Sequence, residues 1–295
     1  MFDGLSVAMV SPFRDGRLDE GAVERLIDHL LDGGARGLVP AGCTGEAAAL
    51  ELPEREKLVR ACVRKKRAGT FVLAGTGTNV TRTTCDLTKR AEDWGADGAL
   101  VITPYYNKPT QAGLIRHYEE VAGASGLPLV LYNVPGRTGV KLEPETIRRL
   151  GEIPTIVGIK EACGSLDQVS ELCGTTDLTI LSGDDSLTLP MLSVGARGVI
   201  SVFGNLFPAA LARMLSAWEK RETREAARIH AGIFPLMKGL FVETSPGPIK
   251  HALARAGLIC EELRLPLVPV SARTAAECDR LVDQAAAFLG ERQIA

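Results

Sequence analysis

A single lysine interrupts an apolar segment near the middle of the chain. Residues 156–162 have the sequence IVGIKEA, so Lys160 falls near the end of a stretch whose β-branched residues predict a buried strand. A charged amine in such a place costs several kcal/mol unless it is paired or neutralised. Two interpretations are open at this point. The side chain extends its amine to the surface, or a partly neutral amine attacks a carbonyl carbon.

Other polar side chains follow the predicted strands in the same manner. They lie in GCTGE (42–46), GTGTN (75–79), TPYYNKP (103–109), YNVPGRTG (132–139), SGDD (182–185) and ISVFGN (200–205). A lysine with tyrosines, an arginine and backbone N–H groups suits imine chemistry, with a tyrosine to move protons and the arginine to hold a carboxylate. Taken alone, Arg137 would be a surface residue at a helix start. Asp184 and Asp185 are expected to cap the helix that follows them.

The elements that would carry these side chains are marked by a repeated G-A-x-G pattern. GGARGLVPAG (33–42), WGADGALVITP (94–104) and VGARGVISVFG (194–204) each place a glycine-capped helix end before an apolar strand. Further strands are predicted at 5–10, 71–75, 129–133, 156–160 and 178–182, with amphipathic helices between them. Eight short buried strands alternating with helices favour an α/β fold, the closed (β/α)8 TIM barrel; a doubly wound open sheet is the alternative.

The pattern changes after the eighth predicted strand. Helical periodicity continues from about residue 221 without a strand-like run, broken by SPGP (245–248) and LPLVPV (265–270). We therefore expect a barrel over residues 1–222 and a small helical C-terminal domain over residues 223–295. No role for the 245–248 segment follows from its residues.

Composition excludes several classes of function. A net charge of −2 gives no basic excess for binding nucleic acid. No apolar stretch is long enough for a membrane span, and the N-terminus lacks the basic residues of a signal peptide, so a soluble, cytoplasmic protein is expected. The seven cysteines form no C-x-x-C pair and the four histidines are isolated, so neither a disulfide framework nor a metal site is expected.

Nearly the whole chain, from MFDGLSVAMVSPF to LRLPLVPV (263–270), resembles the dihydrodipicolinate synthase family of the N-acetylneuraminate lyase superfamily. The resemblance is carried by TPYYNKPTQAG, LYNVPGRTG, GIKEA, LSGDD and GVISV. It implies a Schiff-base enzyme that condenses pyruvate with L-aspartate 4-semialdehyde to 4-hydroxy-tetrahydrodipicolinate, in lysine and diaminopimelate biosynthesis. It also implies that no cofactor is needed and that the protein is a homotetramer, a dimer of tight dimers.

The resemblance implies four catalytic residues. Lys160 would form the imine with pyruvate, and Tyr132 would transfer protons. Tyr106 corresponds to the tyrosine that relatives insert across the tight dimer interface into the neighbouring site. Cys43 stands where relatives have the first threonine of G-T-T-G-E, so a thiol would replace a hydroxyl in the proton relay.

Four further residues would bind the substrates if the resemblance holds. Thr44 would hold the carboxylate of pyruvate and Arg137 that of aspartate semialdehyde, while Ile200 and Gly183 would line the pocket. A second departure lies near the C-terminus, where ETSPGPIK (243–250) replaces an Asn-Pro-Ile-Pro run.

Three alternatives remain at this point. Another lyase or dehydratase of the superfamily, acting on a different 2-keto acid, would keep Lys160 and Tyr132 but not necessarily Arg137. A metal-dependent barrel aldolase and a non-catalytic binding barrel belong to other classes. Because NVPGRTG retains the arginine, the sequence favours the synthase.

Overall fold

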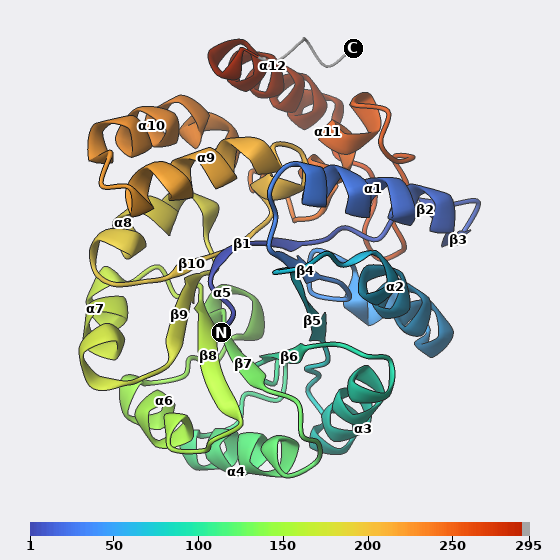
Figure 1. Cartoon of the computed structure of the whole chain (residues 1–295). Coiled ribbons are helices and arrows are strands. Elements are labelled where there is room, and N and C mark those ends of the chain that lie inside the picture. The colour runs from blue at the N-terminus through green and yellow to red at the C-terminus, as the bar shows by residue number, and fades with distance from the viewer. Residues whose placement is uncertain (291–295) are drawn as a thin grey trace.

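Eight parallel strands close into a barrel in this computed structural model, which describes residues 1–290 (Figure 1). Around the barrel the order is β1-β10-β9-β8-β7-β6-β5-β4, and β1 pairs with both β10 and β4. The predicted closed barrel is confirmed, and the open sheet is wrong. The strands are β1 (Gly4–Ala8), β4 (Gly37–Val39), β5 (Phe71–Gly75), β6 (Gly98–Ile102), β7 (Leu129–Asn133), β8 (Ile156–Glu161), β9 (Thr179–Ser182) and β10 (Gly198–Ser201).

Helices surround the strands and continue beyond them (Figure 1). A short hairpin of β2 (Phe13–Arg14) and β3 (Arg17–Leu18) follows the first strand. The helices are α1 (Glu20–Asp32), α2 (Leu52–Lys65), α3 (Thr81–Asp93), α4 (Gln111–Ala122), α5 (Pro135–Thr138), α6 (Pro144–Gly151), α7 (Leu166–Thr175), α8 (Thr188–Ser193), α9 (Pro208–Glu219), α10 (Thr223–Gly239), α11 (Gly247–Arg255) and α12 (Ala272–Leu289). Short 3₁₀ turns lie at Ala47–Ala49, Asp185–Leu187 and Phe203–Asn205.

The three G-A-x-G segments have the structure that the sequence predicts. The first glycine of each, at positions 34, 95 and 195, has a positive φ of 88°, 88° and 116°. Glycine adopts this left-handed conformation without the strain of a Cβ atom, which lets the chain leave a helix sharply. The last glycine of each segment begins a strand, β4, β6 or β10.

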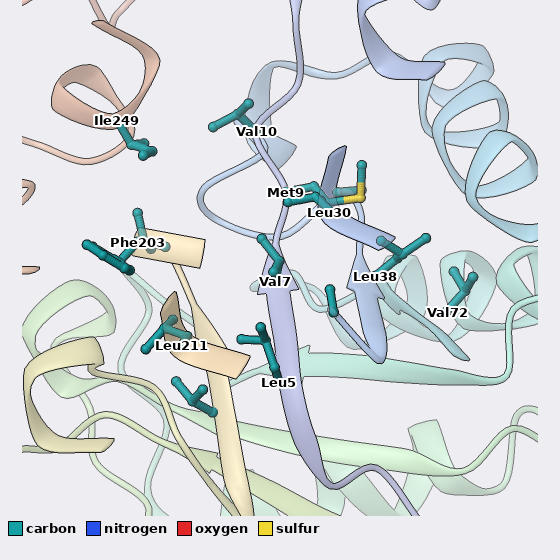
Figure 2. Packing of buried hydrophobic residues seen from close by; sticks show 14 of the residues in the cluster. Leu5, Val7, Met9, Val10, Leu30, Leu38, Val72, Phe203, Leu211 and Ile249 are labelled. Atoms are coloured by element: carbon teal, nitrogen blue, oxygen red, sulfur yellow. The ribbon is translucent and has the colours of Figure 1, made fainter. Parts of the chain in front are cut away.

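Apolar side chains divide between the inside and the outside of the barrel. On β7, Val130 and Tyr132 belong to an inner cluster, whereas Leu129 and Leu131 belong to the larger outer cluster under the helices. This alternation follows from the two-residue period of a strand. Figure 2 shows part of the outer cluster, where Val7 and its neighbours on β1 lie among residues from other strands and helices.

The C-terminal helices pack onto this outer core. Ile249 of α11 is fully buried and joins the same cluster as Val10 and Phe203, close to the barrel in Figure 2. Helix α12 packs against α10 and α11. The division into domains at residues 222 and 223 stays a prediction. Among residues 1–290, no helix combines the length and apolar character needed to cross a membrane.

Candidate active site

Lys160 lies on β8 and faces the interior of the barrel. Its neighbour Ile159 belongs to the outer cluster, and alternation along the strand turns Lys160 inward. Lys160 is only 4% exposed. Its Nζ lies 4.2 Å from the ring centroid of Tyr132, the residue paired with it on β7. The interpretation that this amine extends to the surface is therefore wrong.

Burial makes the amine of Lys160 unusually easy to deprotonate. Loss of solvent around the charged form lowers the pKa of Lys160 to about 8, and Arg137 contributes in the same direction. Cys43, Asp184 and Asp185 oppose this shift. With a pKa of about 8, roughly a tenth of the amine is neutral at pH 7, against less than about one part in a thousand for an ordinary lysine.

Tyr132 connects the lysine to a cavity. Burial raises the pKa of Tyr132 well above its ordinary value, so its hydroxyl is protonated at neutral pH and can donate. A cavity of about 340 Å³ adjoins it, at the end of the barrel where the strands finish. The cavity is lined by Tyr132 of β7, by residues that follow β4, β6 and β7, and by the C-terminal segment. The lining includes Cys43, Tyr105, Arg137, Ser245 and Arg264.

The predicted residues Cys43 and Thr44 lie in a tight turn after β4. The backbone N–H of Glu46 donates to the Cys43 carbonyl at 3.1 Å, and that of Gly45 donates to the Gly42 carbonyl at 3.0 Å. Cys43 lines the cavity and packs against the inner cluster that contains Tyr132. Thr44 is buried beside it in sequence and does not line the cavity.

Ile200 and Gly183 are not among the residues that line the cavity. Ile200 is fully buried in the inner cluster with Tyr132. A Cβ added at Gly183 would lie 2.7 Å from Cβ of Ala162 and 3.1 Å from Cε of Lys160. Because atoms do not pack that closely, any larger residue would displace the lysine or its strand. The absence of a side chain at position 183 thus leaves room for the Lys160 side chain.

Arg137 lies in the short helix α5, directly after β7. Its guanidinium lines the cavity and donates to the Ser245 carbonyl at 3.4 Å. Ser245 belongs to the 245–248 segment, for which the sequence indicates no role. The structure therefore brings the C-terminal segment to the same cavity as Arg137.

Tyr106 is the one predicted catalytic residue that is not gathered with the others. It is 87% exposed and, within residues 1–290, does not line the cavity. Its φ is 74°, in the left-handed region that residues with a Cβ atom rarely adopt. The neighbouring Tyr105 lines the cavity instead.

The expectation that Asp184 and Asp185 cap a helix is wrong. Neither carboxylate caps the turn at Asp185–Leu187. Asp185 is buried, and it accepts hydrogen bonds from the Ser201 hydroxyl and from the backbone N–H of Val202 at 3.0 Å. It therefore joins β9 to the end of β10, a long-range role that neighbouring residues do not reveal.

Sequence reasoning missed a second buried carboxylate next to the lysine. Both oxygens of Glu161 accept from the Asn133 amide at 3.0 Å, and one accepts from the Gln168 amide at 3.0 Å. Glu161 and Asn133 are the register pair that follows Lys160 and Tyr132. This contact fixes the two strands against each other where the lysine meets the tyrosine ring. In the sequence, the signal for this contact is that two adjacent strands each end in a polar residue, Asn133 and Glu161.

Tyr132 and Arg137 line one cavity, and the buried amine of Lys160 lies against the Tyr132 ring. An amine, a protonated tyrosine and an arginine in this arrangement can form an imine, move a proton and hold an anion. Within residues 1–290, no three histidine, cysteine or acidic side chains are grouped as metal ligands. The sequence model of the dihydrodipicolinate synthetase family matches residues 1–285. The chain belongs to this family.

Individual relatives agree with the family assignment. The chain is 50% identical over 274 residues to the 4-hydroxy-tetrahydrodipicolinate synthase of Thermodesulfovibrio yellowstonii, covering 92% of this chain and 94% of that protein. It is 46% identical over 273 residues to the enzyme of the same name from Pelobacter propionicus, covering 92% and 94%. Among solved structures, the synthase of Methylacidiphilum fumariolicum SolV has a TM-score of 0.96 and 42% identity, covering 98% of both chains.

Proposed function

We propose that this dihydrodipicolinate synthetase family member condenses pyruvate with L-aspartate 4-semialdehyde to form 4-hydroxy-tetrahydrodipicolinate, through a Schiff base on Lys160. The observation that carries the proposal is the buried amine of Lys160 with its lowered pKa, 4.2 Å from the centroid of the Tyr132 ring. Tyr132 and Arg137 both line the cavity. Relatives at 50% and 46% identity bear the name of this activity.

The first stage is formation of the imine. The neutral Nζ of Lys160 attacks the ketone carbon of pyruvate, and Tyr132 donates a proton as the hydroxyl leaves as water. Thr44, which is buried next to the cavity-lining Cys43, is assigned to hold the pyruvate carboxylate during this step. The imine then loses a proton from the pyruvate methyl group and becomes an enamine, with the imine nitrogen taking up the electron pair.

The second stage forms the new carbon–carbon bond. The enamine carbon attacks the aldehyde carbon of aspartate semialdehyde, whose carboxylate is held by Arg137 as a charge-assisted pair. The amino group of the new product then attacks the imine carbon, closes the ring and releases Lys160. Protons pass through Tyr132 and Cys43.

Tyr106 supports an assembly in which the site is completed by a second subunit. An aromatic side chain that is 87% exposed and held at a φ of 74° is costly in a monomer. Its cost is offset if the ring is covered in a tight dimer and enters the relay of the neighbouring site. We propose this dimer, two of which form a homotetramer, as the working state.

Cys43 supports a second candidate, a lyase or dehydratase of the same superfamily acting on another 2-keto acid. A thiol is a weaker hydrogen-bonding group than the hydroxyl of a threonine. If the site has changed substrate, Lys160 and Tyr132 would be kept while the aldehyde would differ. Arg137 on the cavity wall favours the synthase.

An activity assay with both substrates distinguishes the candidates. The purified protein is expected to consume pyruvate only when aspartate semialdehyde is present and to release the cyclic product, whose dehydration can be followed by absorbance. Turnover should be unaffected by a chelator, whereas a chelator would abolish the activity of a metal-dependent aldolase. Formation of the pyruvate imine without consumption of aspartate semialdehyde would favour the second candidate.

Arg137→Ala is expected to weaken use of the aldehyde but not of pyruvate. Removing a guanidinium that pairs with a carboxylate should raise the KM for aspartate semialdehyde by about 30-fold, equivalent to about 2 kcal/mol. The KM for pyruvate should change by less than about two-fold, because Thr44 holds its carboxylate. Steady-state kinetics with each substrate varied in turn measure both constants, and Arg148→Ala, at an exposed arginine of α6, is the matched control. Equal loss for both substrates would assign Arg137 a structural role.

A further inference from the structure

A buried ion pair joins the turn after β4 to the C-terminal helices. Glu46 Oε1 lies 2.6 Å from Lys250 Nζ, and the two side chains are 1% and 0% exposed. The partners are 204 positions apart in the sequence. Glu46 follows Thr44 by two positions, and Lys250 lies on α11. Neither residue has a part in the reaction steps above.

The turn that contains Glu46 is strained and needs to be held. Ala41 and Glu46 have φ values of 55° and 52°, in the left-handed region that disfavours residues with a Cβ atom. Such conformations persist where surrounding contacts over-determine them, and they are concentrated at functional sites. From the barrel side, the Ser11 hydroxyl donates to the Gly45 carbonyl at 2.7 Å. From the opposite end of the sequence, Lys250 binds Glu46.

The surroundings leave the carboxylate of Glu46 little freedom. Its second oxygen accepts from the backbone N–H of Arg264 at 2.9 Å. The Phe13 ring lies beside both cations, with its centroid 4.4 Å from Lys250 Nζ and 4.2 Å from Arg264 Cζ. The Arg264 guanidinium in turn binds Glu54 at 2.6 Å. Glu46, Lys250 and Arg264 are therefore each held in place by named polar partners.

A buried ion pair does not in itself imply greater stability. Apolar side chains of the same shape often serve equally well, because two charges lose their hydration on burial. Charged groups differ from apolar ones in that their attraction is directional and fixes a position. The Glu46–Lys250 pair fixes the turn that follows β4, which contains Thr44 and the cavity-lining Cys43.

We propose that Glu46 and Lys250 are positioning residues for the pyruvate half of the reaction. They hold the turn Gly42–Ala47 so that Thr44 meets the pyruvate carboxylate and Cys43 stays beside Tyr132. The C-terminal helices thereby set the geometry of the pyruvate site. This inference rests on the proposed function, in which Thr44 binds pyruvate. The aldehyde half is affected less, because Arg137 lies in the separate helix α5 after β7 and its contact with the Ser245 carbonyl does not involve Glu46.

The test compares Glu46→Gln with a variant that loosens the same turn without touching a charge. Glu46→Gln is expected to raise the KM for pyruvate about ten-fold and lower kcat, while the KM for aspartate semialdehyde stays within about two-fold. Ser11→Ala removes the second contact that holds the turn and should shift the same constants in the same direction by a smaller factor. The matched control is Asp283→Asn, which breaks the 2.7 Å ion pair with Arg255 between α12 and α11 and should leave all constants unchanged.

A double variant separates positioning from stability. Glu46→Gln combined with Lys250→Met removes both buried charges and is expected to recover the Tm that Glu46→Gln loses, but not the KM for pyruvate. If Glu46→Gln does not fold, the double variant and Ser11→Ala decide the matter. Recovery of the pyruvate KM in the double variant, or an equal rise in both KM values, would overturn the proposal. Failure of the wild-type protein to form a pyruvate adduct would instead overturn the proposed function.

Discussion

Treatment with pyruvate and borohydride is expected to leave one reduced adduct per chain, on Lys160, and Lys160→Ala is expected to leave none. Borohydride reduces the imine to a stable secondary amine, so intact mass shows the adduct and peptide mapping locates it. Condensation activity of Lys160→Ala should fall by roughly 10⁴-fold or more, because the substitution removes the amine that forms the imine. Circular dichroism should show a folded barrel in the variant.

The matched control is Lys108→Ala. Lys108 is exposed in the segment after β6, at the same end of the barrel, and is not enclosed by the strands. The variant should keep the adduct. An adduct on any lysine other than Lys160 in the wild-type protein would refute the assignment of the nucleophile.

The pH dependence of adduct formation gives a second measure of the same group. Burial lowers the pKa of Lys160 to about 8, and only the neutral amine attacks the ketone. The initial rate of imine formation should therefore rise from pH 6 toward pH 8 and level off above it. An ordinary lysine would produce a rise that continues beyond pH 10. Quenching timed samples with excess borohydride measures the rate.

Cys43→Ala is expected to lower turnover by about 10²-fold, whereas Cys43→Thr should preserve or raise it. The thiol lines the cavity and packs on the cluster containing Tyr132, where a hydrogen-bonding group can pass protons between the tyrosine and solvent. Alanine removes that group, and threonine replaces it with a stronger donor and acceptor. Steady-state assays with pyruvate and aspartate semialdehyde, under reductant, compare the three proteins.

The control for this series is Cys260, a cysteine that is partly buried like Cys43. Cys260 is partly buried but lies in the C-terminal segment outside the cavity lining, so Cys260→Ala should retain full turnover. If wild type and Cys43→Thr both lack condensation activity while the pyruvate imine still forms on Lys160, the synthase proposal fails. The related 2-keto-acid reaction then takes its place.

Much of the barrel could be predicted from the sequence because its determinants are local. The G-A-x-G segments combine a left-handed glycine with a strand start, and both features depend only on adjacent residues. The short apolar runs predict strands covered on both faces, as in β7. Since parallel strands of a barrel end on one side, the polar residues after them, such as Arg137, could be placed at a common rim.

The state of Lys160 was decided by the tertiary structure. The sequence left open whether its amine reaches the surface, because the same strand end permits both arrangements. Its low exposure and shifted pKa result from the surrounding strands, which exclude water. For the same reason, local sequence predicts a helix cap at Asp185, whereas its partners Ser201 and Val202 lie at the end of β10 and directly after it.

Contacts between segments far apart in the chain could not be predicted from the sequence either. The residues of GCTGE indicated chemistry at Cys43 and Thr44, but not that Glu46 pairs with Lys250, 204 positions away. Ser245, in a segment without a predicted role, proved to lie against Arg137. Local residue types determine which elements form, through backbone preferences and the period of apolar side chains. Which buried charges meet, and how far water is removed from them, depends on how those elements pack, and this only the folded chain specifies.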